Sequence, residues 1–200
     1  MKARHAVVGV ALLGASWAGI CDPGDITIVP EIDETYSFEG GLQGWTPAAL
    51  GSISPAVNWS VDVDGGAAVE GQASLKIFLS DSTGTGRVWI ERAFTVAAEE
   101  EYQVDLAYQV GTEDSTGVAP WSAIVQVSSQ PPSTSGAVTV DGTLDASGGP
   151  GLRWFPRETT VNFDTGVEQE TAWVSIGIAS GDPGARTYRL DGLRVTFTRR

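Results

Sequence analysis

The chain has 200 residues, a formal net charge of −13 and 42% hydrophobic residues. Its acidity disfavours nucleic acid as a partner, because phosphates need a basic surface that replaces their counterions. His5 and Cys21 are the only histidine and cysteine, which excludes catalytic triads, cysteine nucleophiles and Cys/His zinc sites beyond the first residues. The remaining inventory of carboxylates, arginines, hydroxyls and seven tryptophans favours a binding surface over an active site.

Residues 1–21 have the pattern of a secretory signal peptide. Lys2 and Arg4 precede an apolar run at residues 6–15 that is too short to span a bilayer. Cys21 then resembles the acylated cysteine of bacterial lipoproteins, although Ile20 departs from the small residue which that pattern requires. We therefore expect an extracytoplasmic protein, either secreted or tethered to a membrane through acylated Cys21. The acidic residues 22–35 are predicted to be a linker.

From residue 36 onwards the sequence predicts strands and no helix. Runs rich in Val, Ile, Thr and aromatic residues are separated by Gly, Pro, Asp and Ser. The expected strands cover residues 73–79, 87–96, 102–110, 121–127, 138–140, 159–163, 172–179 and 193–198. Residues 128–151 are predicted to be a long connection with one weak strand. This pattern predicts an all-β fold, an antiparallel β-sandwich made by one domain of residues 36–200.

Three fragments set the frame of this domain: YSFEGGLQGW at residues 36–45, EGQASLKI at 70–77 and YRLDGLRVTF at 188–197. In this order they resemble the jelly-roll carbohydrate-binding modules of the CenC type, within the galactose-binding-like fold. The resemblance implies a jelly roll in which the last strand lies beside the first and Trp45 packs on the core. It also implies a non-catalytic domain that binds a polysaccharide or another glycan.

Glu39 and Asp191 lie in the first and last of these fragments. If the two strands are neighbours, both carboxylates converge with backbone carbonyls, which is the oxygen environment that Ca²⁺ prefers. Members of the resembling family often hold a structural calcium there, so the resemblance implies this role for Glu39 and Asp191. Two surface acids in turns are the alternative interpretation.

A sugar site combines flat aromatic platforms with amide, carboxylate or guanidinium groups. Strand positions that point away from the predicted core supply these types at Trp89, Glu91, Gln103, Asp105, Gln126 and Trp173. Trp89 and Trp173 are the predicted platforms, because their strand neighbours place them opposite the apolar face. Packing is the alternative for each tryptophan, and a solvated face is the alternative for the polar residues.

Two other functions stay open at this point. A structural or adhesive cell-surface sandwich needs no sugar site, and burial of Trp89, Trp121 and Trp173 would favour it. A polysaccharide-cleaving enzyme needs two carboxylates at a set separation, and Glu91 and Asp105 form such a pair if their strands are adjacent. The missing histidine chemistry and the resemblance favour the non-catalytic module.

Overall fold

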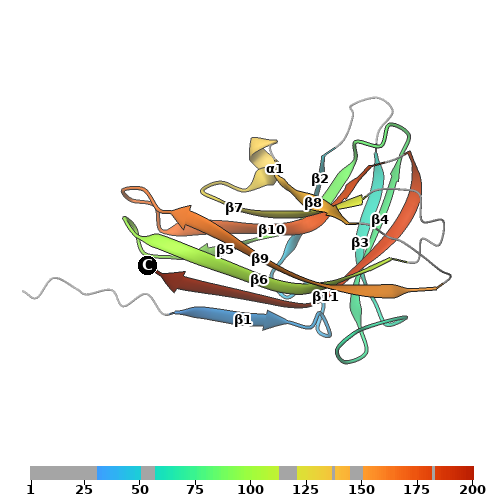
Figure 1. Cartoon of the computed structure of the whole chain (residues 1–200), viewed down its shortest axis with the longest axis horizontal. Helices are drawn as coiled ribbons and strands as arrows, with labels where there is room; N and C mark the ends of the chain where they lie inside the picture. The colour runs from blue at the N-terminus through green and yellow to red at the C-terminus, as the bar shows by residue number, and fades with distance from the viewer. Residues whose placement is uncertain (1–30, 51–56, 113–120, 137, 145–150, 182) are drawn as a thin grey trace, which may run out of the picture.

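The computed structural model describes residues 31–50, 57–112, 121–136, 138–144, 151–181 and 183–200. These residues form two antiparallel sheets packed face to face (Figure 1), so the predicted β-sandwich is confirmed. The expected signal peptide, Cys21 and residues 22–30 of the expected linker lie outside the described residues. No helix in the described part of the chain is long and apolar enough to cross a membrane.

The larger sheet has six strands. Its order is β3 (Asn58–Asp64), β4 (Ser74–Asp81), β11 (Gly184–Arg199), β6 (Glu101–Thr112) and β9 (Arg153–Asp164). The sixth strand, β1 (Ile32–Tyr36), pairs with the C-terminal half of β11, whose N-terminal half pairs with β4. The first and last strands are therefore neighbours, as the resemblance implies.

The second sheet has five strands. Its order is β2 (Thr46–Leu50), β5 (Arg87–Thr95), β10 (Thr171–Ser180), β7 (Trp121–Ser128) and β8 (Val140–Leu144). A single helical turn, α1 (Pro132–Ser135), lies between β7 and β8 in the sequence.

The strongly alternating runs became strands close to their predicted bounds, namely β4, β5, β6, β7 and β10. The prediction missed β1, β2 and β3, and it started β11 nine residues late. Residues 32–35 of the expected linker belong to β1, so the sandwich begins inside that segment. These strands are short or rich in polar residues, and they form because neighbouring strands supply hydrogen-bond partners.

The core lies between the two sheets and follows the alternation of the strands. Leu75, Ile77 and Leu79 of β4 face it from one sheet, and Val88 and Ile90 of β5 face it from the other. Aromatic pairs fill the remaining space at both ends. The Trp45 ring is 5.3 Å from that of Tyr36, and the Trp121 ring is 5.3 Å from that of Tyr188. Trp45 therefore packs on the core, as predicted.

A bulge divides β11 into its two halves. The pairing register with β6 shifts between Asp191 and Arg194, and Gly192 adopts a positive φ of 58°. Asp191 is fully buried beside this bulge, where one carboxylate oxygen accepts the N–H groups of Val69 and Glu70 at 2.6 and 3.0 Å. Its other oxygen accepts the Gly192 N–H. A buried carboxylate is tolerated because its oxygens are satisfied by donors.

Gly177 in β10 occupies a position that only glycine fits. A Cβ atom placed there would lie 2.1 Å from the carbonyl oxygen of Val88 and 2.4 Å from the Cα of Trp89, both on β5. Backbone atoms at this distance cannot move aside without separating β10 from β5. The close approach of these two central strands therefore depends on the missing side chain.

We expect Gly177→Ala to lower the free energy of unfolding by about 1–3 kcal/mol, the usual cost of overpacking. Urea unfolding followed by circular dichroism measures this change. The matched control is Gly40→Ala, because no heavy atom lies within 4 Å of a Cβ atom at Gly40. Equal stability of the two variants would contradict the close-approach argument.

Candidate ligand site on the outer face of the five-stranded sheet

The structure brings four of the six predicted ligand residues to one surface. Glu91 and Ser175 are opposite each other in β5 and β10, Gln126 of β7 pairs with the same Ser175, and Trp89 is opposite Gly177. Trp173 is opposite Ala93, two positions along the same strand pair. Directly opposite residues of a sheet share a face. Trp89, Glu91, Gln126 and Trp173 therefore all lie on the outer face of the five-stranded sheet.

Gln103 and Asp105 lie elsewhere. Both belong to β6 of the six-stranded sheet, on the side that points away from the core. The whole core separates them from the other four residues, so the six cannot form one site. For the same reason Glu91 and Asp105 are not on adjacent strands, and the carboxylate pair considered for an enzyme does not exist. The prediction erred because periodicity identifies outward positions but not the sheet to which each strand belongs.

A short segment covers the centre of the outer face. We call residues 129–136 and 138–139 the strap; it includes α1 (Figure 1). Val138 of the strap forms a small apolar cluster with residues of the sheet, namely Ala48, Trp89, Ile124 and Ala179. Trp89 is 1% exposed in this cluster. The Trp89 ring cannot stack on a sugar in this arrangement. The prediction that Trp89 is an open platform was therefore wrong.

Polar contacts hold the strap in place. The Glu91 carboxylate accepts hydrogen bonds from Trp89 Nε1 at 2.9 Å and from the N–H and hydroxyl groups of Ser133. Gln126 Oε1 accepts the Thr139 N–H at 2.8 Å, and Arg87 donates to the Val138 carbonyl at 2.8 Å. Glu91 and Gln126 thus point outwards as predicted, but their oxygens serve the strap.

The outer face opens where β10 begins and β7 ends. Trp173 is half-buried there and pairs with Ser128, the last residue of β7. A cleft of about 410 Å³ is lined by residues that lie close to this pair in the chain, namely Ser129, Gln130, Val167, Glu168, Gln169, Glu170 and Thr171. We call these residues together with Trp173 the Trp173 cleft. Thr171 and Trp173 are two positions apart in β10, so they share the outer face.

Sequence reasoning found Trp173 but missed the polar residues beside it. Gln130, Glu168 and Glu170 lie in two loops, and the fold alone brings these loops together. The sequence did hold one signal, the acid- and amide-rich stretch at residues 167–170 that directly precedes β10. The loop is anchored by Thr165, whose hydroxyl accepts the Glu100 N–H at 2.8 Å and contacts the Ala97 carbonyl oxygen at 2.9 Å.

The outer face of the six-stranded sheet carries a hydrogen-bonded polar network. Asp105 accepts the Thr160 hydroxyl at 2.6 Å and the Gln103 amide at 3.0 Å, and Arg200 donates to the Gln103 oxygen at 2.8 Å. The hydrogen bond from Thr160, followed by that from Gln103, lowers the pKa of Asp105 below its ordinary value. These contacts favour the solvated-face interpretation for both predicted residues.

Glu39 and Asp191 bind the same loop between β3 and β4. Glu39 Oε1 accepts the N–H groups of Gln72 and Ala73 at 2.6 and 2.8 Å, while Asp191 accepts those of Val69 and Glu70. An oxygen that faces N–H donors is a poor cation ligand. The described residues include no cluster of three or more His, Cys, Asp or Glu suited to a metal. The donor arrangement thus offers calcium no support, and its site at Glu39 and Asp191 stays a prediction.

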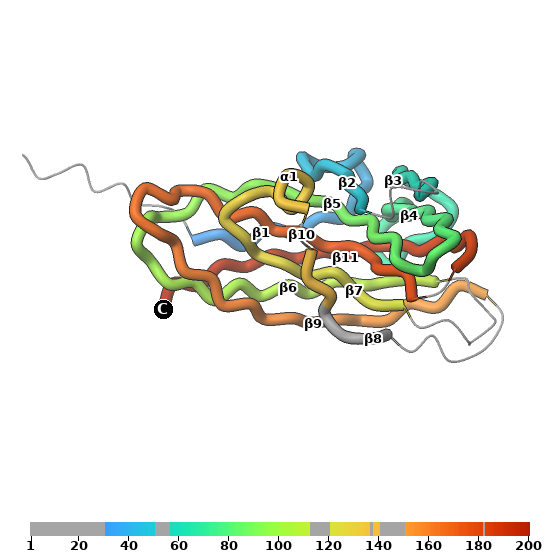
Figure 2. The backbone as a smooth tube through the Cα atoms, turned by 90° about the horizontal axis from the view of Figure 1, so that it is seen from above, coloured from blue at the N-terminus to red at the C-terminus, as the bar shows by residue number. Residues whose placement is uncertain are grey.

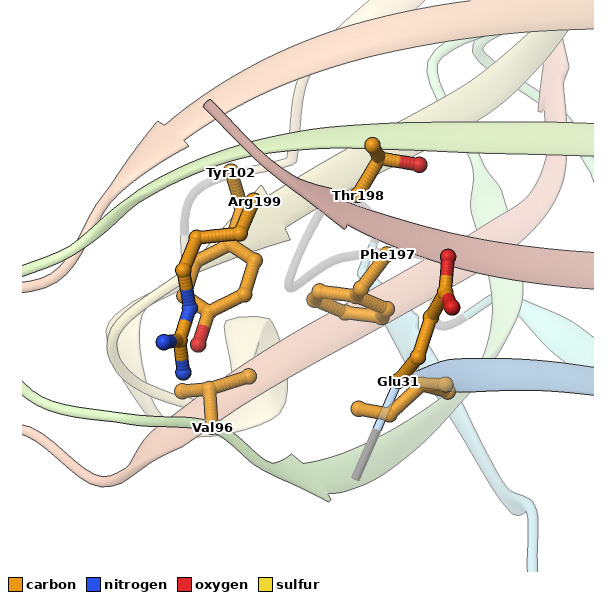
Figure 3. Close-up of a pocket in the computed structure, with 7 residues that line it drawn as sticks. Glu31, Val96, Tyr102, Phe197, Thr198 and Arg199 are labelled. Atoms are coloured by element: carbon orange, nitrogen blue, oxygen red, sulfur yellow. The ribbon is translucent and has the colours of Figure 1, made fainter. Parts of the chain in front are cut away.

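An apolar pocket of about 280 Å³ opens at one end of the sandwich (Figure 3). Tyr102 and Phe197 line it with Ile32 and Val96, and charged side chains lie at its rim. The Tyr102 hydroxyl accepts the Ala97 N–H at 2.9 Å. With mostly core side chains on its walls, this pocket offers few groups for sugar hydroxyls.

Comparison with known proteins identifies the fold. No protein-family model matches the chain, and no curated protein is significantly similar. Among solved structures, the mannan-recognising carbohydrate-binding module TmCBM27 aligns with a TM-score of 0.53 and 12% identity, over 86% of this chain and 100% of that one. The K2 adhesin domain of Lys-gingipain aligns with a TM-score of 0.50 and 15% identity, over 82% and 97%.

A third structure contains the CBM22-1 and GH10 modules of an endo-1,4-β-D-xylanase from Clostridium thermocellum, complexed with xylohexaose. It aligns with a TM-score of 0.50 and 15% identity, over 83% of this chain but 28% of that longer one. Such likenesses establish the architecture. The chain has the β-sandwich fold of carbohydrate-binding modules, which confirms the resemblance at the level of the fold.

We expect Glu91→Ala to lower the free energy of unfolding by about 1–3 kcal/mol, because it leaves the donors of Trp89 and Ser133 unsatisfied. Urea unfolding measures the loss, and amide hydrogen exchange should become faster in residues 131–136. Glu168→Ala is the control, since Glu168 is an exposed loop residue. Unchanged exchange in the strap would contradict the anchoring role of Glu91.

The lowered pKa of Asp105 predicts a loss of stability in acid. Its ionised form is favoured in the folded state, so its contribution is present above the ordinary pKa of 3.8 and is lost as the pH falls through the lower folded value. Asp105→Asn should therefore reduce the acid-induced decrease in unfolding free energy, measured by denaturant titration at a series of pH values. Thr160→Val, which removes the donor, should act in the same direction. A parallel pH profile for wild type and both variants would refute this.

Proposed function

We propose that this chain is a non-catalytic, extracytoplasmic carbohydrate-binding protein that holds a polysaccharide in the Trp173 cleft. The main support for this proposal is that Trp173, which is half-buried on a central strand, lies near an open cleft. Amide and carboxylate side chains line this cleft. An aromatic ring stacks on the apolar face of a sugar, and amides and carboxylates bind its hydroxyls. A ring on a paired central strand is also preorganised, which lowers the entropy cost of binding.

The charge of the cleft restricts the class of glycan. Glu168 and Glu170 are acidic, and no basic residue is among those that line it. An anionic sugar would meet like charge there, in a chain whose net charge is already −13. The proposed ligand is therefore a neutral polysaccharide rather than one rich in uronic acid or sulfate.

Three observations support binding without catalysis. The sequence has no histidine or cysteine after Cys21, the considered pair Glu91 and Asp105 lies on opposite sheets, and the Glu91 carboxylate is buried under the strap. The similar structures described as carbohydrate-binding modules are consistent with this proposal. The signal-peptide pattern of residues 1–21 supports the extracytoplasmic part of this proposal, and Cys21 is the residue that would be acylated in a membrane-tethered form.

A structural or adhesive role is the second candidate. Trp89 and Trp121 are 1% and 2% exposed, so two of the three tryptophans whose burial would favour this role are indeed buried. The fold is also that of an adhesin domain. Trp173 distinguishes the two proposals, because a purely structural domain does not need a tryptophan that stays partly exposed on this face.

A polysaccharide and glycan array with the full chain tests the proposal. We expect binding to neutral glycans and a decrease of about 30-fold in affinity for Trp173→Ala, equal to about 2 kcal/mol for an aromatic hot spot. Trp154→Ala is the matched control, since Trp154 is a half-buried tryptophan of β9 in the other sheet. Folded protein without glycan binding would favour the structural role. The same array with calcium and with a chelator tests Glu39 and Asp191, because a calcium requirement would appear as chelator-sensitive binding.

A further inference from the structure

Among the strands that the structure describes, β3 is at one edge of the six-stranded sheet. Its seven residues pair with β4 on one side, and it ends the strand order of that sheet. Asn58, Trp59, Asp62 and Val63 are exposed. An edge strand carries backbone N–H and C=O groups that a further strand can pair with. Figure 2 places β3 and β4 at the end of the molecule away from the C-terminus.

One face of this edge is apolar and incompletely covered. Trp59, Val61 and Val63 are opposite Leu79, Ile77 and Leu75 of β4, so they continue the core face of the sheet outwards. Trp59 is 38% and Val63 is 39% exposed. Among the described residues, the apolar face therefore extends to the edge of the sheet and is partly exposed there, which favours an interaction surface.

The charges along β3 are balanced within the chain. Asp64 forms a salt bridge of 2.9 Å with Arg189, and Asp62 is opposite Lys76 in the pairing with β4. The chain as a whole has a net charge of −13, which repels a second copy. At this edge, each acid has a basic neighbour, so the local repulsion between two copies is small.

We propose that two copies of this chain associate through antiparallel pairing of their β3 strands about a two-fold axis at Val61. In this register Trp59 lies opposite Val63 of the second copy, and Val61 lies opposite its own counterpart. On the other face, Asn58 and Ser60 lie opposite Asp64 and Asp62 of the second copy. Each acid thus meets an amide or hydroxyl donor, and each apolar residue meets another.

The sequence of β3 selects this register over its neighbours. A two-fold axis at Asp62 would place two carboxylates opposite each other and leave Trp59 beyond the paired region. An axis at Ser60 would leave Val63 and Asp64 outside the seven-residue pairing. The register at Val61 pairs all residues of β3 and joins the two six-stranded sheets into one.

The test is sedimentation velocity of the full chain over a concentration series at low and at high salt. We expect a concentration-dependent dimer whose fraction rises with salt, because salt screens the repulsion between the two acidic chains. Ser60→Asp adds a carboxylate opposite Asp62 of the second copy and should abolish the dimer. Ser60→Asn, which keeps a neutral hydrogen-bonding group, should retain it. Trp59→Ala should weaken association about tenfold.

A wild-type chain that stays monomeric at every concentration and salt would overturn the proposal, and so would a dimer that survives Ser60→Asp. Circular dichroism melting shows that each variant is folded, so loss of the dimer is not loss of the fold. Association through β3 is independent of the Trp173 cleft. Trp173→Ala should leave the dimer unchanged, and a failure of either proposal leaves the other testable.

Discussion

The pairing of β11 with three other strands is the constraint on which the architecture depends. One edge of this long strand pairs with β4 and then with β1, while the other edge pairs with β6. The bulge at Asp191 and Gly192 separates the two segments, and the Asp191 carboxylate fixes the loop before β4 at the same point. Both ends of the domain, the first strand and the last, are thereby held in one sheet. The buried acid provides a polar anchor that an apolar side chain could not supply.

The outer faces of the two sheets differ in what their polar side chains bind. On the six-stranded sheet, polar side chains of β6 and β9 bind one another, as Asp105 binds Thr160. On the five-stranded sheet, the strap covers a second apolar cluster and uses the polar side chains around Trp89 as anchors. The end of that sheet beyond the strap presents a half-buried tryptophan near a cleft lined by polar side chains. The location of the proposed ligand site therefore follows from where the strap stops.

Much of the fold was predictable from local pattern. Strict alternation in β4, β5, β6, β7 and β10 fixed both the strands and their inward residues. The short strands β1 and β2 were missed, since five residues carry too little periodic signal. The site was predictable only in part: Trp173, Glu91 and Gln126 were correctly placed on an outer face, but the polar groups of the cleft come from loops. Loop proximity depends on pairings between distant strands, which one sequence does not reveal.

The sequence by itself determined the all-β class, the inward and outward sides of the main strands, and the lack of histidine and thiol chemistry after Cys21. These properties depend on residue type and on a period of two, so they are local. Only the tertiary structure decided which outward residues share a surface. It put Gln103 and Asp105 on the opposite side of the core from Trp173, and it buried Trp89 beneath the strap. How exposed a residue is depends on the segment that packs above it, and that segment comes from elsewhere in the chain.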